Sequence, residues 1–157
     1  MEIPVLRWIF QAVPECLAAA ALALVLASRS LETRSVFLIG LPQAVAAYLV
    51  RLLPLTFGVH TIVLIVVMAA LLNVLLEIKL SRSLLVALVV LIILVAVEMV
   101  FISLMTYITG ITFQEASRVI ILSIVYGWPH TVFLFLLALV IYRWQISRHL
   151  KKGVIKT

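Results

Sequence analysis

The sequence predicts an all-α, polytopic membrane protein: a transmembrane helical bundle with about five spanning helices. Of its 157 residues, 66% are hydrophobic and only 11% are charged, whereas about a quarter of an ordinary soluble domain is charged. A soluble chain of this size could not bury so much apolar surface, and the excess would aggregate in water. We therefore expect a single domain that is embedded in a cell membrane as a multi-pass protein.

The distribution of charge supports a membrane location. The net charge of +6 comes from 12 Lys and Arg residues against 6 Asp and Glu residues. A basic chain can indicate nucleic-acid binding, but most of these basic residues are scattered singly between apolar runs. One cluster follows the last apolar run and comprises Arg143, Arg148, Lys151, Lys152 and Lys156. Membrane proteins carry cytoplasmic positive charge in this place, so we expect membrane lipids as partners and no nucleic acid.

Five apolar runs are long enough to cross a bilayer, which takes about 20 residues of helix. By residue number they cover 4–27, 35–53, 59–78, 84–108 and 117–144. The first run carries Glu15 beside a proline, Pro14, and the second contains Pro42 and ends near Arg51. This division predicts a transmembrane domain over residues 1–144 and a basic cytoplasmic tail over residues 145–157.

The last three runs differ in their polar content. The third has Asn73 as the one strongly polar residue in its interior, and the fourth, which is the most apolar, contains one carboxylate, Glu98. We expect Gly127-Trp128-Pro129 to break the fifth. Thr112-Phe113-Gln114-Glu115 is typical of a capping box, so this helix is expected to begin early, at residue 113. A continuous helix from there to residue 143 would be about 46 Å long.

The basic residues favour one orientation of the five helices. Arg29 and Arg34 follow the first run, Lys79 and Arg82 follow the third, and the basic tail follows the fifth. These connections share one side of the membrane, which the positive-inside rule places in the cytoplasm. The N-terminus is then outside and the C-terminus inside. The sequence before Ser28 also looks like a signal-peptidase site, but cleavage there would put the basic tail outside, so we expect none.

Aromatic residues mark the expected membrane interfaces. Trp8 and Tyr107 are predicted near the outer face, and Tyr142 and Trp144 near the inner face. Trp128 is the exception, because it is expected in the middle of the membrane. The connections are short, so helices that follow one another in the sequence should pack as antiparallel neighbours.

Ionisable residues inside a membrane are costly and indicate candidate functional sites. Glu98 is predicted to lie about 21 Å along its helix from the inner end, and Arg51 is at a similar depth in the second helix. Equal depth allows an ion pair between Arg51 and Glu98 within a ligand-binding or coupling site in the outer half of the bundle. A purely structural pair, or two side chains that snorkel separately, is the alternative interpretation.

Two histidines complete the candidate ligand-binding or coupling set. His60 opens the third helix near the outer surface, where it could sense pH or contact a ligand. More often, such a histidine caps or hydrogen-bonds a loop. His130 follows Pro129 and could bind a carbonyl that this proline leaves free, and a local structural role is the favoured interpretation.

Three further polar residues are expected to form interhelical contacts: Glu15, Gln43 and Asn73. Amide side chains in membrane helices commonly hydrogen-bond across to a neighbouring helix. Glu15 follows Pro14 as His130 follows Pro129, so a structural role is also favoured for this carboxylate.

The motifs of enzymes and metal sites are missing from the sequence. The three histidines His60, His130 and His149 lie on separate segments, without the spacing of a metal site. No Ser or Cys lies in a nucleophile motif, and no Gly-rich phosphate loop occurs. The single cysteine, Cys16, allows neither an internal disulfide nor a thiolate metal site. We therefore expect no enzyme activity, no cofactor and no metal.

One region resembles a known family. It comprises the stretch Arg51-Leu52-Leu53-Pro54-Leu55-Thr56-Phe57-Gly58-Val59-His60-Thr61, the apolar helix after it, the Lys79-Leu80-Ser81-Arg82-Ser83 turn and the helix with Glu98. Together these features resemble the membrane-spanning sensor regions of a group of Gram-positive bacterial histidine kinases, relatives of the peptide-sensing quorum kinases. The likeness covers most of the chain.

The family pattern continues with a cytoplasmic dimerisation and ATP-binding region after the last helix, whereas this sequence ends at Thr157. No phospho-acceptor histidine or ATP site can be assigned. The resemblance therefore implies a sensor-like module that stands alone or is a piece of a longer kinase. It does not imply kinase activity.

Three functions are consistent with these features. The leading hypothesis is a sensory or regulatory module of two-component signal transduction. It would bind an unknown signal among the outer ends of the second, third and fourth helices and pass it to a cytoplasmic kinase through the fifth. The alternative is a small transporter subunit, in which Ala18-Ala19-Ala20-Ala21 would let a partner helix approach closely. The odd number of spans and the lack of repeats disfavour it. The third is an assembly protein without a ligand, and a second copy of the chain is a further candidate partner.

Overall fold

The computed structural model describes residues 5–53 and 57–154, and these contain helices and no strand. The predicted all-α class is therefore confirmed for this part of the chain. Parts of three predictions lie outside the described residues: Pro4 of the first span, Pro54-Leu55-Thr56 of the sensor-like stretch, and Lys156 of the basic tail.

The elements follow one another as α1 (Val5–Arg7), the π-helical turn η1 (Trp8–Ala12), α2 (Val13–Leu26), α3 (Thr33–Leu52), α4 (Phe57–Leu76), α5 (Leu80–Thr109), α6 (Phe113–Ala116) and α7 (Ile120–Val154). Within the described residues, five stretches are long and apolar enough to cross a membrane: Trp8–Leu26, Thr33–Leu52, Val59–Leu76, Leu80–Thr109 and Ile120–Arg148. The five predicted spans are thus confirmed, and the protein is a multi-pass helical membrane protein.

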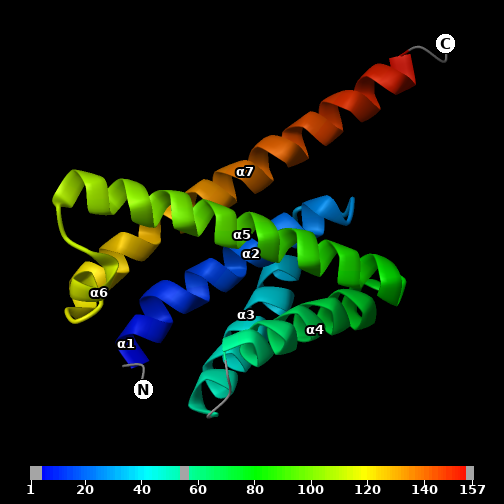
Figure 1. The fold of residues 1–157 in the computed structure, drawn as a ribbon. Coiled ribbons are helices and arrows are strands. Elements are labelled where there is room, and N and C mark those ends of the chain that lie inside the picture. The colour runs from blue at the N-terminus through cyan, green and yellow to red at the C-terminus, as the bar shows by residue number, and fades with distance from the viewer. Residues whose placement is uncertain (1–4, 54–56, 155–157) are drawn as a thin grey trace.

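Helix α2 lies at the centre of the bundle (Figure 1). It packs against α3, α5 and α7, while α4 packs against α3 and α5. All the residues from 18 to 25 are buried. Because eight consecutive residues point in every direction around a helix, α2 is enclosed on all sides along this segment. The patch Ala18-Ala19-Ala20-Ala21 is therefore covered by the chain's own helices and does not offer the free surface that the transporter hypothesis requires.

Helices α2 and α7 run in the same direction (Figure 1). The indole N–H of Trp128 donates to the Phe10 carbonyl near the start of both helices, and the Gln145 amide donates to the Val25 carbonyl near the end of α2. We call the end at which the described chain begins the N-terminal end of the bundle. The end toward which α7 runs is the C-terminal end, and it contains the α2–α3 and α4–α5 connections.

Basic side chains join these two connections. Arg29 Nη2 donates to the carbonyl of Leu76, the last residue of α4, at 2.6 Å. Arg82 Nη2 donates to the carbonyl of Ala27, directly after α2, at 3.1 Å. The last carbonyls of a helix lack intrahelical partners, so the two guanidinium groups cap helices that are far apart in the sequence.

Asn73 also acts at the C-terminal end. Its amide Nδ2 donates to the Ile78 carbonyl in the α4–α5 connection at 2.6 Å. The bond closes the turn that follows Asn73's own helix. The expected interhelical bond is therefore replaced by a local one.

The predicted capping box is confirmed at α6. The Glu115 N–H donates to Thr112 Oγ1 at 3.3 Å, and the Thr112 N–H donates to the Glu115 carboxylate at 2.9 Å. Hydrogen bonds from the hydroxyl and the N–H of Thr112 lower the pKa of Glu115 below its ordinary value. The expected continuous helix from residue 113 is wrong, however, because α6 ends at Ala116 and α7 begins only at Ile120.

Helix α7 passes through Pro129 without interruption, so the predicted break at Gly127-Trp128-Pro129 is wrong. Its 35 residues correspond to about 52 Å of helix, more than the roughly 30 Å of a bilayer core. The helix continues to Val154, beyond the tail boundary predicted at residue 144, and its last part projects past the other helices (Figure 1). Residues 145–154 are therefore a helical extension of the last span.

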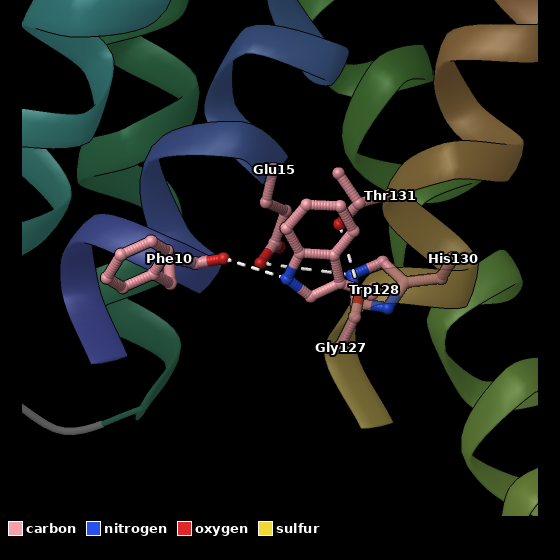
Figure 2. Close-up of polar contacts among 6 residues, drawn as sticks. All are labelled: Phe10, Glu15, Gly127, Trp128, His130 and Thr131. Atoms are coloured by element: carbon pink, nitrogen blue, oxygen red, sulfur yellow. Dashed lines mark hydrogen bonds and ion pairs between the residues drawn. The ribbon is translucent and has the colours of Figure 1, made fainter. Parts of the chain in front are cut away.

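Pro14 accounts for the position of Trp128. Proline has no N–H, so it cannot donate to the Phe10 carbonyl four residues earlier. The Trp128 indole donates to that carbonyl at 3.1 Å (Figure 2). Trp128, the exception to the expected interfacial pattern, thus donates a hydrogen bond to a carbonyl of η1.

Trp128→Phe is expected to lower the free energy of unfolding by about 1 kcal/mol, because the Phe10 carbonyl loses its side-chain donor. In a Pro14→Ala background the same substitution should lower the free energy of unfolding by less, because the backbone N–H of the alanine at position 14 becomes available to the Phe10 carbonyl. Thermal unfolding in detergent, followed by circular dichroism on all four proteins, measures the coupling. An equal loss in both backgrounds would show that the indole acts through packing alone.

A candidate ligand-binding cavity

A cavity of about 600 Å³ lies between α2, α3, α4 and α5. Much of its wall is apolar and includes Leu64, Ile65, Met68, Leu91 and Leu94. Sites for small organic molecules typically have volumes of about 300–1,000 Å³ and apolar walls with a few polar groups. The cavity therefore has the size and composition to hold such a molecule.

Three of the predicted site residues line the cavity together: Arg51 from α3, His60 from α4 and Glu98 from α5. Helices α3 and α5 both begin at the C-terminal end of the bundle. At helical rise, Arg51 and Glu98 each lie about 27 Å from the first residue of their helix. We call the part of the cavity that Arg51 and Glu98 line its shallow level. The predicted ion pair between Arg51 and Glu98 is not formed, since the ion pair found among the described residues joins two other groups. The two charges share a cavity without a direct contact.

Glu15 from α2 and Gln43 from α3 line a deeper part of the cavity. At helical rise, Glu15 lies about 16 Å from the last residue of α2, and Gln43 lies about 15 Å from the first residue of α3. Both helix ends are at the C-terminal end of the bundle, and we call this part of the cavity the deep level. Gln43 Nε2 donates to the Leu64 carbonyl of α4 at 3.0 Å, so the predicted interhelical contact of Gln43 is confirmed. Gln43 Oε1 has no hydrogen-bond partner, although the residue is only 7% exposed. A buried acceptor without a donor is costly.

Glu15 links the cavity to α7. Its Oε2 lies 3.9 Å from Nε2 of His130. Figure 2 shows the two side chains facing each other, and this contact joins α2 to α7 as predicted for Glu15. His130 is 1% exposed and is not among the residues that line the cavity. Its two ring nitrogens have no hydrogen-bond partner, so the predicted bond to a carbonyl near Pro129 is not formed. The Thr131 hydroxyl donates to the Gly127 carbonyl instead, at 3.0 Å.

The first span also contributes to the cavity, which was not predicted. The site was expected among the second, third and fourth spans, but Gln11, Glu15 and Ala19 of η1 and α2 also line the cavity. Residues four apart lie on one face of a helix, so this spacing was a signal that the sequence contained. Gln11 and Ala12 belong to the π-helical turn, a feature that recurs at functional sites.

Among the residues that the structure describes, no group of three or more His, Cys, Asp or Glu side chains could hold a metal ion. Cys16 lines the cavity with its thiol in the free form. No protein-family model, curated protein or solved structure matches this chain. The arguments for function therefore rest on the architecture itself: a multi-pass helical bundle with ionisable side chains around a small-molecule-sized cavity.

Proposed function

We propose that the protein is a sensory or regulatory membrane module that binds a small signal molecule in the cavity and couples it to a cytoplasmic signalling partner. The observation that carries the proposal is the cavity of about 600 Å³, which has Glu15, Arg51 and Glu98 in its wall. Ionisable groups are expensive inside a membrane. An assembly protein without a ligand gains nothing from placing them around a cavity, so this arrangement favours ligand binding.

The contact between Glu15 and His130 supports coupling through α7. Glu15 lines the cavity, and His130 lies on the helix that projects beyond the bundle. A ligand that attracts the Glu15 carboxylate draws it away from His130. Such a ligand can shift the position of α7 only if it binds one helix arrangement better than the other. The two arrangements differ in whether Glu15 contacts His130 or the ligand.

We place the C-terminal end of the bundle in the cytoplasm. Arg29, Lys79 and Arg82 gather there, and Arg143 and Arg148 lie on the same side along α7. Such an excess of positive charge is typical of cytoplasmic faces. The resemblance to sensor regions of histidine kinases supports the same orientation and suggests a kinase or its regulator as the partner.

A transporter subunit remains the second candidate, because the same cavity could hold a transported substrate. The burial of Ala18-Ala19-Ala20-Ala21 inside the bundle removes the surface that was expected to receive a partner helix. Co-purification from native membranes distinguishes the two functions. A kinase partner supports sensing, and an ATPase complex supports transport.

Loss of the cavity charges should disturb signalling more than folding. We expect deletion of the gene to change a set of transcripts, measured by RNA sequencing, and wild-type protein to restore them. Arg51→Gln and Glu98→Gln should restore them poorly although their membrane levels equal that of wild type. Met99→Leu, a change beside Glu98 on the exposed face of α5, is the matched control and should restore them fully. Full restoration by both charge variants would show that the site assignment is wrong.

A further inference from the structure

We infer that the signal is an organic cation, in which an ammonium group on an apolar body binds between Glu15 and Gln43 at the deep level of the cavity. This inference rests on the proposed function, because it names the ligand class of the same cavity. It goes further in predicting the charge of the ligand and where its charged group lies.

A buried acceptor in the cavity wall lacks a donor. Gln43 Oε1 is buried without a hydrogen-bond partner. Oε2 of the Glu15 carboxylate lies 3.9 Å from His130 Nε2, which is too long for a hydrogen bond. Glu15 and Gln43 come from neighbouring helices, α2 and α3, and both line the cavity. An ammonium group has three N–H donors and no acceptor, so a single group can serve both oxygens.

The charges of the cavity wall favour a cation as the ligand. The cavity wall contains two carboxylates, Glu15 and Glu98, and one guanidinium, Arg51. A single guanidinium cannot offset both carboxylates, and the group beside Glu15 is the imidazole of His130. An uncompensated charge in an apolar environment is costly. A monovalent cation compensates it, whereas an anionic ligand adds a second negative charge next to Glu15.

The size of the cavity favours a ligand with an apolar body. A volume of about 600 Å³ is far larger than an ammonium group requires. The apolar side chains of Leu64, Met68, Leu91 and Leu94 surround the remaining space. The thioether of Met68 adapts easily to differently shaped partners. The apolar part of the ligand therefore lies against α4 and α5.

The test uses three probes with one apolar body and different charge: 4-phenylbutylamine, 4-phenylbutanol and 4-phenylbutanoate. Isothermal titration calorimetry is performed on the whole protein in lipid nanodiscs, and empty nanodiscs correct for partition into lipid. We expect the amine to bind saturably and at least tenfold more tightly than the alcohol, with the acid weakest.

Variants locate the charged group. Glu15→Gln should reduce the affinity for the amine to that for the alcohol and leave the alcohol unchanged. Glu15→Asp should retain the preference for the amine. Gln43→Met should weaken amine binding severalfold, and circular dichroism checks that each variant is folded. If Glu15→Gln does not fold, the comparison between Gln43→Met and wild type carries the test.

The outcomes separate the two proposals. Tighter or equal binding of the acid or the alcohol by wild-type protein would overturn the cationic ligand, but ligand binding in the cavity would stand. An amine preference that survives both Glu15→Gln and Gln43→Met would overturn the deep-level site. If none of the three probes binds, the deep-level cation site fails, and the restoration of transcripts by Arg51→Gln and Glu98→Gln decides the proposed function separately.

Discussion

Gly40→Ala should destabilise the protein by about 1–3 kcal/mol, the usual range for overpacking of a tight contact. An added Cβ would lie 2.9 Å from the Leu17 Cα and 3.2 Å from the Cys16 carbonyl oxygen. These are backbone atoms of α2 and cannot rotate away, so α2 and α3 must move apart. The loss should exceed the gain of about 1 kcal/mol that alanine brings to a helix interior. Thermal unfolding in detergent, followed by circular dichroism, measures the change.

Gly127→Ala is the matched control for Gly40→Ala, because it introduces the same methyl group into another membrane helix. Its Cβ would approach the side chain of Gln11, with 2.6 Å to Nε2. All three close atoms belong to one side chain, which can shift more readily than the backbone of a helix, so this variant should lose less stability than Gly40→Ala. If the two variants unfold at the same temperature, the close approach of α3 to the α2 backbone is not a source of stability.

Ala47→Phe should weaken the binding of 4-phenylbutylamine by more than tenfold. Ala47 lies four residues from both Gln43 and Arg51, and all three line the cavity from α3. An aromatic ring here occupies the space between the deep and shallow levels and excludes the body of the probe. Filling an internal cavity restores lost contacts, so the thermal stability should be unchanged or higher. Calorimetry in nanodiscs and thermal unfolding give the two readouts.

Val45→Phe controls for the introduction of an aromatic ring on the same helix. Val45 is 47% exposed and is absent from the cavity wall, so this ring faces away from the site. The variant should bind the amine with wild-type affinity. Wild-type affinity in Ala47→Phe as well would place the probe outside this cavity.

Features that depend only on a short stretch of the chain could be predicted from the sequence. Each span was expected from the length of one apolar run, because the thickness of the bilayer sets that length. The capping box of Thr112 and Glu115 involves residues three apart and also agreed with the structure. Such features need no knowledge of which helices become neighbours.

The path of α7 through Pro129 depends on more than local sequence. Proline removes one backbone bond and ends many helices in water, which is why a break was expected. In membrane helices, neighbouring groups and nearby hydroxyls can compensate for that loss. Helix α7 continues through Pro129 to Val154.

By itself the sequence determined that this is a five-span helical membrane protein with ionisable residues in its spans. Only the tertiary structure decided that α2 is the central helix, that Glu15 faces both the cavity and His130, and that Arg51 and Glu98 stay apart. The physical reason is the solvent. In lipid, the buried and the exposed faces of a helix are both apolar, so hydrophobic patterning does not reveal which face packs inside. Rotation and neighbours are then settled by close contacts such as that of Gly40 against Leu17, and these exist only in the assembled bundle.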